Sequence, residues 1–100
     1  VEVLVKLNNQ RSIAEAYNAV AALYLDQKNT AKTLANAELA LAAAKSANAS
    51  IELRKSYELL YLTYKNLNDF QRALYYQEQY SSINDLLQQE NDQSSIIAKE

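Results

Sequence analysis

The feature that most constrains the fold of this chain is an internal sequence repeat with a period of forty residues. Tyr17 and Tyr24 recur as Tyr57 and Tyr64. A period of this length is typical of stacked helical units, each of which buries its apolar face only against its neighbours. The repeat therefore predicts an all-α chain, an α-solenoid in which antiparallel helix hairpins stack side by side.

The composition favours helices joined by very short links. The 100 residues include no Gly and no Pro, whereas average proteins carry about 7% Gly and about 5% Pro. Because both residues serve mainly turns, their absence indicates that little of the chain lies outside helices. Apolar residues make up 49% of the chain, enough for one core at this length. We expect a single domain.

The charge pattern argues against nucleic acid as a partner. Ten basic and twelve acidic residues are scattered along the chain, and the net charge is −2. No basic stripe forms, so phosphate backbones have no surface to bind. The chain also lacks the apolar run of about 18 residues that a membrane span requires, and we expect no membrane contact by this segment.

Missing residue types disfavour catalysis, cofactors and metal sites. The chain has no His and no Cys, which removes the histidine base, the thiolate nucleophile and the usual zinc ligands. No glycine-rich loop is present to hold a phosphate. We therefore expect a protein that is not an enzyme and that binds neither cofactor nor metal. The absence of Cys leaves the cellular compartment open.

The forty-residue shift divides the chain into segments. Residues 1–8 are predicted to end a helix whose beginning is missing, because the chain starts without Met in an apolar run, as a fragment of a longer protein would. Residues 12–48 should form a first hairpin and residues 50–84 a second, with residues 85–100 as a C-terminal helical extension. We expect the polar stretch 90–95 to fray the last helix or to link it to a further helix near Ile96.

Capping residues predict where the helices start and stop. Asn8 and Asn48 are expected to end helices in the left-handed conformation, which Asn tolerates better than most residues. Ser12 and Glu15 have the spacing of a capping box, which predicts a helix start. Further starts are predicted from the possible N-cap residues Thr30, Ser50 and Asp69.

These segments resemble a known family. Residues 17–25, with the polar turn 26–29 and the pair Ala40-Leu41, resemble a tetratricopeptide repeat, and residues 57–64, 66–70 and 73–76 resemble a second one. The resemblance covers about residues 12–84. It implies pairs of helices, A and B, in which the A helices line a concave wall that binds proteins or peptides.

The sequence departs from the family pattern in several places. Tyr61 is bulky where its counterpart Ala21 is small, so we expect looser packing in the second unit. Lys28 and Asn68 replace the usual turn glycine. A unit of forty residues instead of about 34 implies a longer helix B. That longer form is similar to repeats in some bacterial sensor kinases and transcription regulators, which implies a place in a bacterial signalling protein.

If the family geometry holds, the side chains of the A helices that face away from the tyrosines contact a partner. The residues in those positions are Glu15, Asn18, Ala22, Leu25, Asp26, Lys55, Glu58, Leu62, Lys65 and Asn66. We expect the Asn18 amide to hold a peptide backbone, Leu25 and Leu62 to give apolar contact and Lys65 to contact a carboxylate. A plain solvated helix face is equally compatible with these residues.

The tyrosines and the C-terminal helix suggest other uses. Eight tyrosines could line a ligand groove, but helical spacing predicts that Tyr17, Tyr24, Tyr57 and Tyr64 lie in the core. One of Tyr75, Tyr76 and Tyr80 is expected to be exposed. Alternatively, the chain is a structural spacer or dimerisation element whose final helix makes the contact along Ile83, Leu87, Glu90, Ser94 and Ile97. A third possibility is a homo-oligomer formed through the exposed ends of the repeats.

Overall fold

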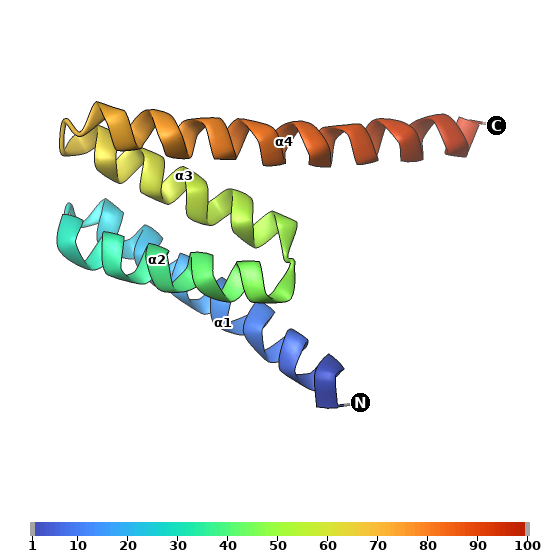
Figure 1. The fold of residues 1–100 in the computed structure, drawn as a ribbon, viewed down its shortest axis with the longest axis horizontal. Coiled ribbons are helices and arrows are strands. Elements are labelled where there is room, and N and C mark those ends of the chain that lie inside the picture. Colours follow the sequence, from blue (N-terminus) through green and yellow to red (C-terminus); the bar gives the residue numbers. More distant parts are fainter. Residues whose placement is uncertain (1, 100) are drawn as a thin grey trace.

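Residues 2–99 form four α-helices in the computed structural model, which describes the backbone of these residues and the side chains of residues 9–89. The helices are α1 (Glu2–Asp26), α2 (Thr30–Ala47), α3 (Ser50–Asn66) and α4 (Phe70–Lys99). α1 pairs with α2 and α3 pairs with α4, and the two hairpins lie side by side through contacts of α3 with α2 and α1 (Figure 1). The all-α fold of stacked antiparallel hairpins is confirmed.

The same turn joins each helix to the next. One residue in each turn lies in the left-handed region, and these are Lys28, Asn48 and Asn68, with φ values of 61°, 51° and 62°. The following N–H donates to the carbonyl five residues earlier in every case, from Asn29 to Tyr24 at 2.9 Å, from Ala49 to Ala44 at 3.0 Å and from Asp69 to Tyr64 at 2.9 Å. This hydrogen bond defines the Schellman motif at a helix end. The turns recur every twenty residues, half of the sequence period.

The first predicted helix boundary is wrong. α1 runs without interruption from Glu2 to Asp26, so Asn8 and Ser12 lie inside a helix and residues 1–8 do not end a separate one. Glu15 forms an ion pair with Arg11 at 3.6 Å, one turn away on the same helix, instead of closing a capping box. Asn and Ser cost a helix interior only a few tenths of a kcal/mol each, and neither stops a helix as Pro does.

Two of the predicted N-caps are wrong by one residue. α2 is capped by Asn29, whose side chain accepts a hydrogen bond from the Lys32 N–H at 3.3 Å, and Thr30 is already helical. α3 follows Ala49, which makes no side-chain cap, and Ser50 is its first residue. The N-cap of α4 is as predicted, because the Asp69 carboxylate accepts from the Arg72 N–H at 3.3 Å.

The last helix also continues further than predicted. α4 has no break or fraying over residues 90–95 and extends to Lys99. Of the predicted contact line along this helix, Ile83 and Leu87 are half-buried. The side chains of Glu90, Ser94 and Ile97 lie outside the described residues.

Small side chains form the core where the two hairpins meet. Ala21 and Ala37 are fully buried, and Leu60 of α3 packs against them with no exposed surface. A second cluster joins Ala14 and two alanines of α2 to Leu53, a residue of α3. Methyl groups at these positions let the helix axes approach closely, so the Leu side chains of α3 fill the space between α1 and α2.

The tyrosines of the second hairpin are buried more deeply than those of the first. Tyr57 and Tyr64 are each 8% exposed, which confirms their core placement, whereas Tyr17 and Tyr24 are only half-buried. The predicted exposed tyrosine is Tyr75, with 54% of its surface accessible.

Candidate partner-binding groove

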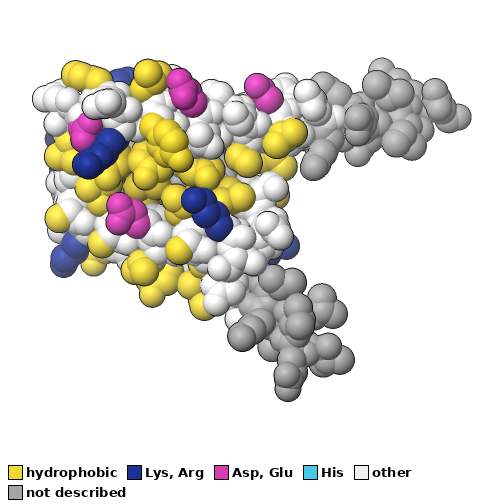
Figure 2. All heavy atoms as spheres, viewed as in Figure 1, with side chains coloured by type: hydrophobic (Ala, Val, Ile, Leu, Met, Phe, Trp, Pro, Cys, Tyr) yellow, Lys and Arg dark blue, Asp and Glu magenta, His cyan; other side chains and the backbone are white. Residues whose placement is uncertain are grey.

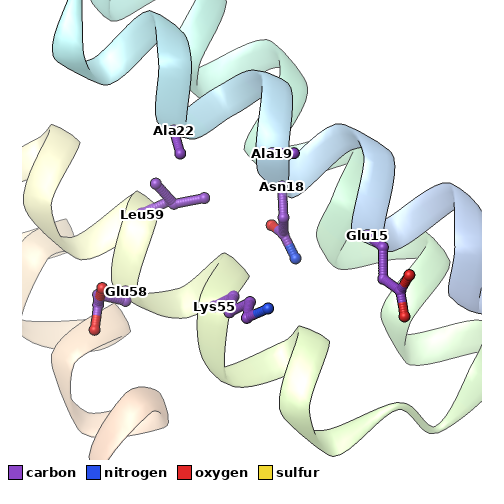
Figure 3. Close-up of a pocket in the computed structure, with 7 residues that line it drawn as sticks. All are labelled: Glu15, Asn18, Ala19, Ala22, Lys55, Glu58 and Leu59. Atoms are coloured by element: carbon purple, nitrogen blue, oxygen red, sulfur yellow. The ribbon is translucent and has the colours of Figure 1, made fainter.

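A groove between α1 and α3 brings together part of the predicted concave wall. It encloses a hollow of ≈ 290 Å³. The lining residues are Glu15, Asn18, Ala19 and Ala22 of α1 with Lys55, Glu58 and Leu59 of α3 (Figure 3). All of them except Ala19 and Leu59 were predicted from the sequence. The spacing of Glu15, Asn18 and Ala22 points to Ala19 as well, because residues three and four apart share one helix face.

The hollow exists because α1 presents methyl groups opposite a leucine. Ala19 and Ala22 are exposed, and Figure 3 shows the Leu59 side chain pointing toward Ala22 across the hollow. Leu59 itself is 8% exposed and belongs to the core between the hairpins. The floor of the groove is therefore apolar and well supported, which suits an apolar side chain of a bound segment.

Charged side chains stand around this apolar floor. Glu15 is paired with Arg11, and the Lys55 ammonium lies 3.8 Å from a carboxylate oxygen of Glu52. Glu58 has no ion-pair partner among the described side chains. The Arg11–Glu15 pair is exposed at both side chains, and exposed pairs contribute little to stability and can exchange partners easily. The groove thus offers a free carboxylate next to a surface of methyl groups.

Asn18 has a different role from the one predicted for it. The residue is only 4% exposed, and its amide nitrogen donates to the Glu52 carbonyl at 3.1 Å and to the Glu52 carboxylate at 3.2 Å. Its amide oxygen accepts from the Ser56 hydroxyl at 2.8 Å. The amide is already engaged inside the protein, where it links α1 to α3, and is not free to hold a peptide backbone.

Glu52 and Ser56 are the hydrogen-bond partners of Asn18, and sequence reasoning missed both. We call these three residues the polar clamp. They are 4% and 0% exposed and lie on the stripe of α3 that faces the first hairpin. Every buried polar side-chain atom among the described residues has a hydrogen-bond partner. A clamp that is fully paired fixes the register of α3 against α1 and supports the groove from below.

The remaining predicted residues lie elsewhere. Leu25 and Asn66 line a second hollow of ≈ 340 Å³, together with Lys28, Thr30 and Thr33. Lys65 lines a third hollow of ≈ 320 Å³ between α3 and α4, and its ammonium lies 5.9 Å from the centre of the Tyr61 ring. Leu62 is half-buried and Asp26 is exposed, and neither lines any of these three hollows. The predicted residues therefore do not form one continuous site.

Aromatic side chains form a separate cluster between α3 and α4. Tyr76 lies at its centre, with its ring stacked on Tyr64 at 5.7 Å and near Tyr57 at 6.2 Å and Tyr75 at 5.0 Å. Burial raises the pKa of Tyr76, and the neighbouring Tyr64 and Glu38 raise it further. Burial, with a contribution from Tyr75, also raises the pKa of Tyr57. These rings stabilise the second hairpin.

Hydrophobic side chains also reach the surface. Figure 2 shows them gathered in a band across the middle of one face, with acidic and basic side chains at its edges. None of the described helices combines the length and the apolar character needed to cross a membrane. Among the described side chains, no three Asp or Glu residues come together as metal ligands.

Comparisons with known proteins give no further guide to the role of this groove. No protein-family model, no curated protein and no solved structure matches the chain.

Proposed function

We propose that the chain is a non-enzymatic protein-interaction scaffold that binds a peptide or protein segment in the groove between α1 and α3. The observation that carries the proposal is the hollow in which Ala19 and Ala22 face Leu59, ringed by Glu15, Lys55 and Glu58. The resemblance of residues 12–84 to tetratricopeptide repeats supports it, and we propose that the chain belongs to that family within a larger bacterial signalling protein.

The size of the hollow favours a peptide over a small molecule. Small-molecule sites enclose about 300–1,000 Å³ and surround most of the ligand. This hollow lies just below that range, at ≈ 290 Å³, and is partly open to solvent. It suits one apolar side chain of an extended or helical segment. The unpaired Glu58 carboxylate favours a Lys or Arg near that side chain.

A displayed peptide library tests the proposal. Peptides selected on the wild-type chain should share an apolar residue beside a basic one, and their affinity is measured by fluorescence anisotropy. Ala22→Arg fills the hollow from an exposed position, so it should weaken binding by about tenfold or more without loss of helicity.

The matched control is Ala42→Arg, a substitution at an exposed alanine on α2. It adds the same charge and bulk away from the groove and should leave peptide affinity unchanged. Equal affinities of the wild-type chain and Ala22→Arg for the selected peptides would contradict binding in this groove.

The uninterrupted course of α4 favours a second candidate, a dimerisation element that acts through the C-terminal helix. α4 extends to Lys99, and Leu86 on it is 57% exposed. If α4 makes the contact, Leu86→Arg converts a dimer to a monomer in light-scattering measurements. A dimer that persists in this variant would exclude the face of α4 that carries Leu86 as the contact surface.

A further inference from the structure

The interface between the two hairpins uses one face of α3. Leu53 of this face packs against alanines of α1 and α2, and Leu60 packs against Ala37 in the main core. The Ser56 hydroxyl donates a hydrogen bond to the amide oxygen of Asn18 on α1. This interface inside the chain is a template. The forty-residue period places positions equivalent to this face of α3 on α1, and positions equivalent to the surface that receives it on α3 and α4.

The equivalent face of α1 is exposed. We call it the leading face, and it consists of Ile13, Ala16, Val20 and Leu23, the counterparts of Leu53, Ser56, Leu60 and Thr63. Leu60 and Thr63 are 0% and 1% exposed, whereas Val20 and Leu23 are 37% and 60% exposed. The leading face therefore carries the apolar side chains of a packed interface but leaves them partly exposed to water.

The surface that receives α3 also has an open counterpart. α3 packs on a surface that includes Ala21, Thr33 and Ala37, all 0% exposed. We call the counterpart the trailing face, and it is the ≈ 320 Å³ hollow lined by Tyr61, Lys65, Phe70, Ala73, Leu74 and Gln77. Each of these residues lies forty positions after a residue between 21 and 37 of the first hairpin. Phe70 and Leu74 remain 64% and 55% exposed.

We propose that copies of the chain associate head to tail, with the leading face of one copy on the trailing face of the next. α1 of the second copy then lies on the α3–α4 hairpin of the first, as α3 lies on the α1–α2 hairpin within each chain. Every copy carries one face of each kind, so the contact is heterologous and can repeat. The proposal does not depend on the peptide-binding groove.

Charges at the two faces support a second copy as the occupant. Within the chain, Leu25 of α1 and Asn66 of α3 line one hollow. The equivalent positions in the proposed contact are Lys65 of one copy and Asp26 of the next, which carry opposite charges. Both side chains are exposed. Opposite charges at the rim of an interface favour the correct partner and register.

Glu15 and Lys55 form a second pair of opposite charges in the proposed contact. Glu15 of α1 and Lys55 of α3 line the groove within the chain. In the proposed contact, Lys55 of one copy takes the role of Glu15 and faces Glu15 of the next copy. The charges remain opposite because the two counterparts exchange places. Such self-complementarity is what a contact between copies requires.

Two single variants, each blocking one face, test the proposal by light scattering and sedimentation up to about 1 mM protein, a range that detects even weak association. The wild-type chain should form species larger than a monomer that grow with concentration. Leu23→Arg on the leading face and Leu74→Arg on the trailing face should each raise the dissociation constant by about tenfold or more. Both positions are more than half exposed, so circular dichroism should show the wild-type helix content.

A mixture of the two variants distinguishes the head-to-tail contact from a symmetric one. Leu23→Arg keeps its trailing face and Leu74→Arg keeps its leading face, so an equimolar mixture should form a 1:1 dimer that grows no further. The control is Leu39→Arg, at a leucine of α2 that is 51% exposed and outside both faces, and it should assemble as the wild type does.

Three results would overturn the proposal. These are a wild-type chain that stays monomeric over the whole concentration range, a Leu74→Arg variant that assembles normally, and a mixture that contains monomers only. The first would show that a second copy does not cover the two faces.

A charge exchange tests the register of the contact. Asp26→Lys and Lys65→Asp should each weaken association by about two- to fivefold, and their combination in one chain should restore it.

Discussion

Lys28 has a backbone conformation that other residues hold more easily. Its φ of 61° places its β-carbon close to the following carbonyl, which costs about 1 kcal/mol for a residue other than Gly, Asn or Asp. Asn48 and Asn68 occupy the same position in the other two turns and tolerate it better. The first turn is therefore the most strained of the three.

Lys28→Gly should raise the free energy of unfolding by about 0.5–1 kcal/mol, because glycine has no β-carbon to clash. Urea denaturation followed by circular dichroism measures the change. Lys28→Ala removes the charged side chain but keeps the β-carbon, and it should give no such gain. A glycine variant that is less stable than the wild type would show that the left-handed conformation of Lys28 does not lower the free energy of unfolding.

Tyr76 links stability to alkaline pH. Burial and the neighbouring Tyr64 and Glu38 raise its pKa, so the folded chain holds the phenolic proton more tightly than the unfolded chain does. The resulting stabilisation is present below the ordinary tyrosine pKa of about 10 and is lost as the pH rises through the folded-state value. The free energy of unfolding should fall above about pH 10, and Tyr76→Phe should reduce that fall.

Ultraviolet absorbance of the phenolate tests the cause of this shift. Glu38→Gln removes one of the charges that raise the Tyr76 pKa, so the folded variant should ionise at lower pH than the wild type. Glu78→Gln removes the same charge from an exposed position on α4 and is the control. Identical titration curves for Glu38→Gln and the control would contradict the assignment.

At the scale of the helices, the polar clamp determines how α3 sits on α1. Asn18 makes three hydrogen bonds to α3 from a buried position, two of them to Glu52 and one to Ser56. On the side of α1 the rest of this buried contact consists of alanines such as Ala14 and Ala21, which specify its register poorly. A buried and fully paired polar group is strict about its partners, so a slipped register would leave it unpaired.

Asn18→Ala should lower the free energy of unfolding by about 2–3 kcal/mol, because it takes a hydrogen-bond partner away from each of the buried side chains of Glu52 and Ser56. Chemical denaturation measures the loss. Asn36→Ala is the control, since the Asn36 amide makes only an exposed hydrogen bond to the Lys32 carbonyl. It should change stability by less than about 0.5 kcal/mol. Similar losses in the two variants would mean that the clamp has no special weight.

The sequence predicts the three turns but not the continuous stretches. Asn8 and Asn48 look alike locally, yet the chain turns only at Asn48. The difference is tertiary, because the turn at Asn48 lets Leu53 pack against Ala44 on the preceding helix. Burial after a turn decides whether a polar residue ends a helix, and local propensity does not contain that information.

Part of the groove was predictable from the sequence and part was not. Residues 15, 18 and 22 share one face of a helix by spacing alone, so their gathering follows from periodicity. The engagement of Asn18 could not be foreseen, because its partners Glu52 and Ser56 lie 34 and 38 residues away. Which polar residues on a predicted face are free depends on the packing of the neighbouring unit.

At the scale of the whole molecule, the two hairpins form a flat body with extents of 48 × 33 × 20 Å. Each end exposes large apolar side chains, such as Leu23 at one end and Phe70 at the other, with 60% and 64% of their surfaces accessible. A body this thin has little interior, so much of its available apolar surface lies on the ends. A partner that covers these ends would add to the stability of the folded chain.

If a second copy covers the ends, the melting temperature should rise with protein concentration, because association stabilises only the folded chain. Each kcal/mol of added stability should raise the melting temperature by about 4–8 °C for a chain of this size. Calorimetry over a wide concentration range measures the shift. Leu23→Arg, which blocks one end, should melt at nearly the same temperature at every concentration. A wild-type melting temperature independent of concentration would oppose stacking of copies.

The turn that recurs at residues 28, 48 and 68 makes the architecture depend on parity. Each turn reverses the chain, and successive helices alternate between the two sides of the stack. Inserting or deleting one twenty-residue step would exchange the sides of every later helix and separate the groove residues of α3 from those of α1. Inserting or deleting forty residues keeps each later helix on its side of the stack and keeps the groove residues together. The length of such a chain can therefore vary only by whole hairpins, in multiples of forty residues.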